Sequence, residues 1–96
     1  MSVRLIITST AVAGKGGELA AIMRERYKEI RKEPGCEHFE MFQSVDDPDK
    51  LVTLELWKDD AALAVHAELI KVSGPTAPHL RAGVSQREDY VYNRTR

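Results

Sequence analysis

Residues 51–57 form a predicted strand that is largely apolar on both faces. Because side chains alternate along a strand, Val52, Leu54 and Leu56 share one face. The other face carries Leu51, Thr53, Glu55 and Trp57. A sheet that contains such a strand needs a covering layer on each side, and this requirement is the strongest constraint on the fold.

The rest of the chain alternates between strand-like and helix-like segments. Alternating or β-branched residues predict four strands, over residues 3–12, 36–45, 51–58 and 84–92. Apolar residues at helical spacing predict a helix from about Leu19 to Glu33, which Pro34 and Gly35 end. A second helix follows its predicted N-cap, Asp59, and ends within residues 73–78. The segment through Leu80 is expected to hold another turn or to act as a lid.

This order of elements predicts a single α+β domain over residues 1–96. Strand–helix–strand units in tandem are typical of the ferredoxin-like βαββαβ arrangement, an antiparallel sheet with both helices on one face. Two helices can cover only one face of the strand at residues 51–57. Since a large apolar sheet face is rarely left in water, we expect a homodimer that packs sheet against sheet.

Composition and charge exclude several classes of partner. A net charge of −1 offers no basic surface for nucleic acid or for an anionic membrane, so neither partner is expected. The apolar run near the N-terminus lacks the basic leader and cleavage site of a signal peptide, and we interpret it as a strand. The only cysteine, Cys36, cannot form an internal disulfide and is expected to be buried filler. These features predict a cytoplasmic protein.

Four motifs, in order and on the predicted elements, resemble those of a known family. They are Glu33-Pro34-Gly35-Cys36-Glu37-His38-Phe39-Glu40, Asp46-Asp47-Pro48-Asp49-Lys50, Glu55-Leu56-Trp57 and Ala61-Ala62-Leu63-Ala64-Val65-His66. Together they resemble the antibiotic biosynthesis monooxygenase (ABM) domain over about two-thirds of the chain. After His66, Ala67-Glu68-Leu69-Ile70-Lys71 replaces the S-P-H-[FY] segment that is frequent in that family, although His79 could approach the same space.

The resemblance implies a dimeric α+β barrel with one cleft per subunit, between the helices and the sheet. Some relatives oxygenate phenols, naphthols or quinols with O₂ and without metal or organic cofactor. The same fold also includes haem-degrading enzymes and a sugar-phosphate isomerase, so the fold alone does not fix the reaction. We therefore expect a cofactor-independent monooxygenase of a small aromatic. The alternatives are an isomerase or other proton-transfer enzyme, and a non-catalytic dimer that binds a small ligand.

Two residues are predicted to be catalytic. His66 lies on the apolar stripe of the second helix, and its imidazole can exchange a proton near neutral pH; the alternative is a structural histidine. Trp57 matches the tryptophan of the E-x-W motif, which lines the site in some relatives. Its indole N–H could bond a substrate oxygen, or the ring could be the main core aromatic.

Five further residues are predicted to contact the substrate: His38, Phe42, Thr53, Glu55 and Leu63. Thr53 and Leu63 occupy positions where certain relatives carry an asparagine and a tyrosine. Glu55 shares the face of Trp57 and is expected to form a structural ion pair, or else to be a half-buried carboxylate with a raised pKa. By strand alternation His38 lies on one row with Cys36 and Phe42, and its alternative is an exposed strand residue. The three histidines are far apart and no paired ligand motif occurs, so no metal is expected.

Overall fold

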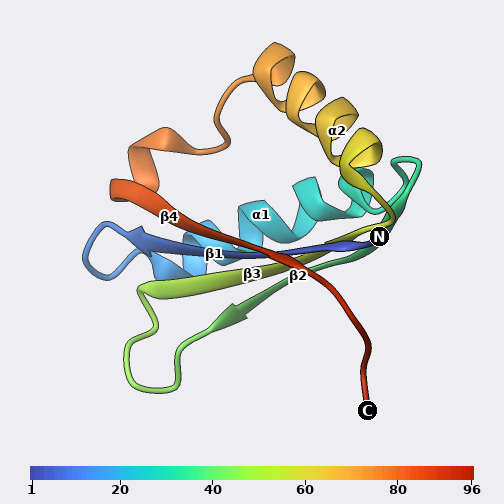
Figure 1. Ribbon diagram of the computed structural model, residues 1–96. Helices are drawn as coiled ribbons and strands as arrows, with labels where there is room; N and C mark the ends of the chain where they lie inside the picture. The colour runs from blue at the N-terminus through green and yellow to red at the C-terminus, as the bar shows by residue number, and fades with distance from the viewer.

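A computed structural model describes residues 1–96. The elements are β1 (Val3–Ala11), α1 (Gly16–Ile30), β2 (Cys36–Gln43), β3 (Lys50–Trp57), α2 (Asp60–Ser73), the 3-10 turn η1 (Pro78–Leu80) and β4 (Arg81–Val91). The strands form one antiparallel sheet in the order β2-β3-β1-β4. Both helices pack on the same face of this sheet, and α2 stands apart from α1 (Figure 1). The predicted ferredoxin-like α+β fold is confirmed.

The two faces of β3 differ in burial as its alternation predicts. Leu51, Thr53, Glu55 and Trp57 are all buried beneath the helices. The intervening Val52, Leu54 and Leu56 are only partly covered, and the outer face of the sheet has no second layer in the single chain. One strand therefore supplies both the floor of the helix-covered side and an apolar row on the outer side.

Local chemistry explains where the helices begin and end. Asp59 caps α2 as predicted, because its carboxylate accepts a hydrogen bond from the Ala62 N–H at 2.8 Å. Gly35 has a φ of +82°, and a Cβ there would lie 2.5 Å from the Cβ of Ala62, so the turn after α1 needs glycine. The first helix stops at Ile30, before the predicted Glu33, and residues 31–35 turn instead.

The start of β4 differs from prediction because strand pairing outweighs local residue preference. β4 begins at Arg81, three residues before the predicted start, because Arg81 and Ala82 pair with the end of β1. The register shifts just after this pairing, and Gly83 takes a φ of +69° there. Glycine accepts this backbone conformation without a Cβ clash, so an irregular strand continues where alternation alone indicates a loop.

A register shift near the start of β2 changes the predicted facing of Cys36. Cys36 pairs with Trp57 and His38 pairs with Leu56, so two steps along β2 correspond to one step along β3. Simple alternation placed Cys36 on the same row as His38, and that part of the prediction is wrong. The extra residue turns Cys36 toward the core, where it packs against buried residues. Burial raises the pKa of its thiol, as does the nearby Glu33.

Candidate functional site

A cavity of about 460 Å³ lies between α1, α2 and the sheet. Its floor includes Thr53 and Glu55 of β3, and one wall is the imidazole of His66 on α2. Residues 74–76, after α2, line the cavity as well, so part of the segment predicted as a turn or lid does border this space. This volume accommodates an aromatic molecule of two or three rings.

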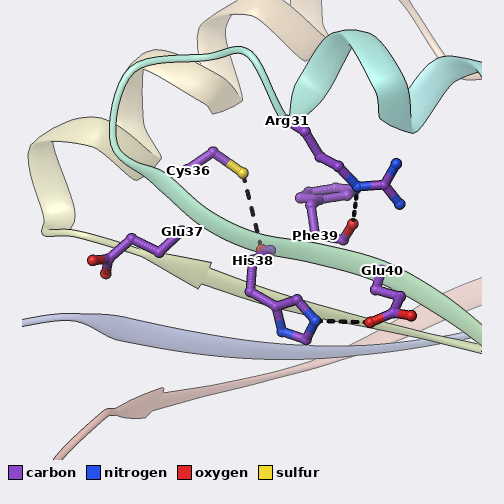
Figure 2. Close-up of a pocket in the computed structure, with 6 residues that line it drawn as sticks. All are labelled: Arg31, Cys36, Glu37, His38, Phe39 and Glu40. Carbon is purple, nitrogen blue, oxygen red and sulfur yellow. Dashed lines mark hydrogen bonds and ion pairs between the residues drawn. The ribbon is translucent and has the colours of Figure 1, made fainter.

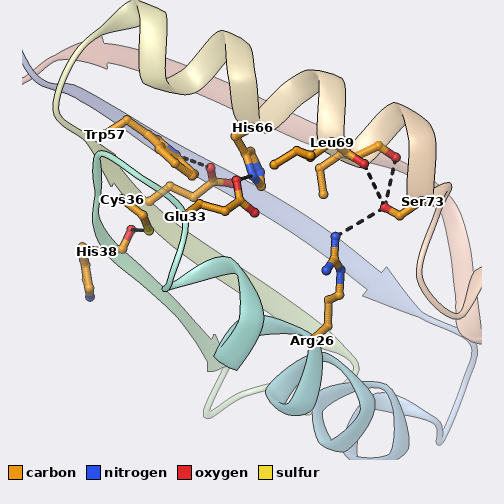
Figure 3. A network of polar contacts seen from close by, with 10 residues as sticks. Arg26, Glu33, Cys36, His38, Trp57, His66, Leu69 and Ser73 are labelled. Carbon is orange, nitrogen blue, oxygen red and sulfur yellow. Dashed lines mark hydrogen bonds and ion pairs between the residues drawn. The ribbon is translucent and has the colours of Figure 1, made fainter.

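His66 faces the sheet as its position on the apolar stripe of α2 predicts. His66 is only 8% exposed, and Nδ1 lies 2.9 Å from Oε1 of Glu33, which comes from the turn after α1 (Figure 3). A carboxylate can only accept at this distance, so the imidazole proton belongs on Nδ1. Nε2 has no protein partner, and no buried side-chain nitrogen in the protein lacks one, so Nε2 is open to solvent.

Trp57 packs against the His66 ring and does not itself line the cavity. The two rings stack with centroids 4.5 Å apart at 30°, and Phe39 meets both rings edge-on. Trp57 is 0% exposed, and its Nε1–H donates to Glu55 at 2.8 Å. The predicted bond from the indole N–H to a substrate is therefore not available, because that donor is already used inside the protein. Trp57 is instead a central aromatic residue of the core, which was the alternative reading.

Glu55 is a buried carboxyl group without a cationic partner. Its side chain is 2% exposed and lines the cavity, and no lysine, arginine or histidine lies within ion-pair distance of it. The expected ion pair is thus wrong, and the alternative holds. Burial raises the pKa of Glu55, while the Trp57 N–H opposes that rise. A carboxyl group that exchanges protons closer to neutrality borders the same space as His66.

The middle of the cavity is lined by a phenol and a hydroxyl group that bond each other. Tyr27 of α1 and Thr53 of β3 are both buried, and their oxygens lie 2.6 Å apart. Burial is the main reason that the pKa of Tyr27 is raised, so its phenol stays protonated and can donate. Thr53 thus lies in the cavity as predicted, but its hydroxyl already has a protein partner.

His38 and Phe42 do not share the cavity of His66. They pair with Leu56 and Val52, so their side chains emerge on the outer face of the sheet. Nδ1 of His38 accepts a hydrogen bond from Nη1 of Arg4, and its Nε2–H donates to Oε1 of Glu40, each at 3.0 Å. In Figure 2 the imidazole of His38 points away from Phe39, which belongs to the core side. Like Trp57, these two residues lie outside the predicted common site, because β2 presents their side chains on the outer face of the sheet, away from the helices.

Two other residues named from the sequence also lie outside the cavity. Leu63 is partly buried and packs against the core, where it helps to hold α2 on the sheet. His79 is exposed on η1 and does not line the cavity, so it does not replace the second histidine of the family pattern. No three side chains of histidine, cysteine, aspartate or glutamate gather in a group that could hold a metal ion.

Three polar residues near the cavity were not predicted as site residues from the sequence. Glu33 belongs to a quoted motif, but its contact with His66 spans 33 positions and has no sequence signal of its own. Tyr27 falls on the buried, apolar side of α1, and nothing in the sequence marks its hydroxyl as a group of the site. Arg81 lies before the predicted start of the last strand, and only the longer strand in the structure brings it to the cavity.

Comparison with known proteins agrees with this architecture. The family model "Antibiotic biosynthesis monooxygenase" matches residues 2–84. Comparison with curated proteins finds no match. None of the helices has both the length and the apolar character that a membrane crossing requires.

Solved structures share the fold along nearly the whole chain. PA3566 from Pseudomonas aeruginosa is 24% identical, with a TM-score of 0.80 over 97% of this chain and 95% of that one. Rv0793 from Mycobacterium tuberculosis is 18% identical, with a TM-score of 0.81 over 99% and 98%. At these identities the likeness shows the fold alone. The family match covers most of the sequence, and the chain therefore belongs to the antibiotic biosynthesis monooxygenase family.

Proposed function

We propose that this protein is a cofactor-independent monooxygenase that oxidises a small aromatic, of the phenol, naphthol or quinol type, with O₂. The observation that carries the proposal is the pair of His66 and Glu33 beside the cavity. The carboxylate holds the proton on Nδ1 and leaves Nε2 as a base that faces an open, partly apolar space. The family match supports a function of the monooxygenase type.

The first step is removal of the substrate's hydroxyl proton. Nε2 of His66 accepts that proton, and the charged imidazolium that results is stabilised by the carboxylate of Glu33 at 2.9 Å. The stacked indole of Trp57 keeps the imidazole plane fixed during this exchange. General-base help of this kind contributes roughly 10² to 10⁴-fold to a rate.

The phenolate then supplies all the electrons for O₂. One oxygen atom forms a bond to a ring carbon ortho or para to the hydroxyl that carries a hydrogen, and the second leaves as water when the resulting hydroperoxide breaks its O–O bond. The ring loses the hydrogen at that carbon and the hydroxyl hydrogen, and the product is a quinone. Four electrons pass from the ring to O₂, so no external reductant is needed.

The proposal includes the assembly and the location of the protein. Val52, Leu54 and Leu56 form an apolar row on the uncovered sheet face, and exposed Phe42 extends it. A homodimer packed sheet against sheet would cover this row. The single cysteine, which cannot form an internal disulfide, supports a reducing compartment such as the cytoplasm.

Oxygen-electrode kinetics with a naphthol or a hydroquinone test the reaction. His66→Ala should slow O₂ consumption by roughly 10²-fold or more, the usual contribution of a general base. Glu33→Ala should give a smaller loss, because the imidazole remains but its orientation is no longer fixed. Glu68→Ala is the matched control on α2, since this exposed residue forms only a surface ion pair with Lys71.

The outcome also separates the alternatives. An isomerase or another proton-transfer enzyme would need His66 but would form the same product under nitrogen as under air. A binding module would hold the aromatic without turnover. Full activity in a folded His66→Ala variant would make this histidine structural and would remove the basis of the proposed mechanism.

A further inference from the structure

A positively charged group without a counter-ion lines the end of the cavity farthest from His66. Arg81, the first residue of β4, contributes a partly buried guanidinium. It donates from Nε to the Thr76 carbonyl at 2.9 Å, from Nη1 to Ser9 Oγ at 3.4 Å, and from Nη2 toward Met23 Sδ at 3.2 Å. No aspartate or glutamate forms an ion pair with it.

These contacts leave much of the guanidinium's bonding capacity unused. Five N–H groups are available on an arginine, and here the contact to Ser9 is long and the sulfur of Met23 is a weak acceptor. A planar fork with free N–H groups matches the two oxygens of a carboxylate. A partly buried guanidinium whose hydrogen-bond acceptors are distant or weak can therefore bind an anionic group.

The sheet register sets the order of polar groups along the cavity. Glu55 pairs with Leu5 on β1, Thr53 pairs with Ile7, and Ser9, which contacts Arg81, lies two residues further. At about 3.3 Å per residue, the levels of Glu55 and Ser9 are roughly 13 Å apart along the strand. His66 is beyond Glu55, since it stacks on Trp57. The proton acceptor and the guanidinium thus lie toward opposite ends of one elongated cavity.

A second arginine increases the positive charge of this cavity. Arg26 of α1 also lines it, and its guanidinium reaches across to Ser73 of α2 at 3.3 Å (Figure 3). Arg26 likewise forms no ion pair. The only acid among the lining residues is Glu55, which lies toward the His66 end and away from Arg81. The cavity is therefore suited to a ligand with a negative charge.

We infer that the ligand is an elongated aromatic acid, whose carboxylate binds Arg81 while its hydroxyl lies at the His66 end. This deepens the proposed function, on which it rests for the role of the ligand as substrate. Arg81 acts as a specificity-determining residue, because it selects and orients the ring without taking part in proton transfer. One guanidinium balances one carboxylate, and the cavity wall between the two ends is largely apolar.

The test compares two probes that differ only in the carboxylate, 6-hydroxy-2-naphthoate and 2-naphthol. Calorimetric titration without oxygen measures binding apart from turnover, so failure of the oxygenase proposal does not affect it. The acid should bind at least about tenfold more tightly, as expected for hydrogen bonds to a charged group. Arg81→Gln should remove this preference and leave the affinity for 2-naphthol within about twofold, because only the anion contact is lost.

Two further variants keep the result interpretable. Arg81→Lys keeps the charge but loses the planar fork, and it should retain part of the preference. Arg24→Gln removes an exposed arginine of α1 that does not line the cavity, and it should bind both probes as the wild type does. Equal affinities of the wild type for the two probes, or no binding of either, would overturn the inference, as would a preference that survives in folded Arg81→Gln.

Discussion

Replacing Trp57 with Phe removes the only side-chain donor that Glu55 has. The indole Nε1 lies 2.8 Å from Oε1 of Glu55, and neither side chain is appreciably exposed. A phenyl ring keeps the stacking partner of His66 but has no N–H to offer. The variant therefore leaves a buried carboxyl group unsatisfied, and the free energy of unfolding should fall.

The size of that fall should depend on pH. A neutral hydrogen bond contributes about 1 kcal/mol to stability, and one to a charged group about 1.5 to 3 kcal/mol. Burial raises the pKa of Glu55 above its ordinary value of 4.5, and Trp57 counteracts this rise. Without the indole the pKa of Glu55 in the folded state rises further, so the charged form becomes harder to bury.

The sign follows from the protons bound by each state. Near pH 4 the carboxyl group is largely protonated in folded and unfolded chains, and the variant loses only the neutral bond. As the pH rises, the unfolded chain releases its proton first, so stability falls until the folded-state pKa is passed. The folded-state pKa of Glu55 is higher in Trp57→Phe, so the stability of the variant keeps falling up to a higher pH than that of the wild type. The cost of the substitution should grow from about 1 kcal/mol near pH 4 to about 3 kcal/mol near pH 8.

Urea unfolding followed by far-ultraviolet circular dichroism measures this cost at both pH values, since the variant has no tryptophan to report by fluorescence. The control is the same substitution in a Glu55→Gln background. There the side chain cannot ionise, so the cost of Trp57→Phe should not change with pH. A cost that is equal at pH 4 and pH 8 with Glu55 present would refute the coupling between these two residues.

Two other outcomes test the proposed assembly and the proposed independence from cofactors. Leu54→Asp puts a charge in the apolar row of the outer sheet face, and it should abolish the dimer in sedimentation experiments, because an unpaired buried charge costs several kcal/mol. A wild type that sediments as a folded monomer at micromolar concentration would contradict the dimer itself. Oxidation of a hydroquinone should persist after treatment with a chelator, and the purified protein should have no visible absorption band. A band present in stoichiometric amount would instead favour haem.

The order of elements and the two faces of β3 were predictable because each depends on local periodicity. The position of His66 was predictable for the same reason, since a helical stripe indicates which side chains face a sheet. His38 and Phe42 were misplaced because alternation defines two rows without indicating which of them faces the helices. The register shift after Cys36 and the contact between Glu33 and His66 depend on tertiary packing, which no periodicity encodes.

Because β3 contributes side chains to both faces of the sheet, any displacement of this strand moves the residues on both faces together. Thr53 and Glu55 border the cavity, while Leu54 and Leu56 belong to the outer apolar row. A ligand that displaces the strand by pressing on Glu55 also displaces the row with which a second copy would pack. Thermodynamic linkage then requires that self-association change ligand affinity by the same factor as the ligand changes self-association. Affinity measured across a range of protein concentrations would reveal this coupling as a dissociation constant that varies with dilution.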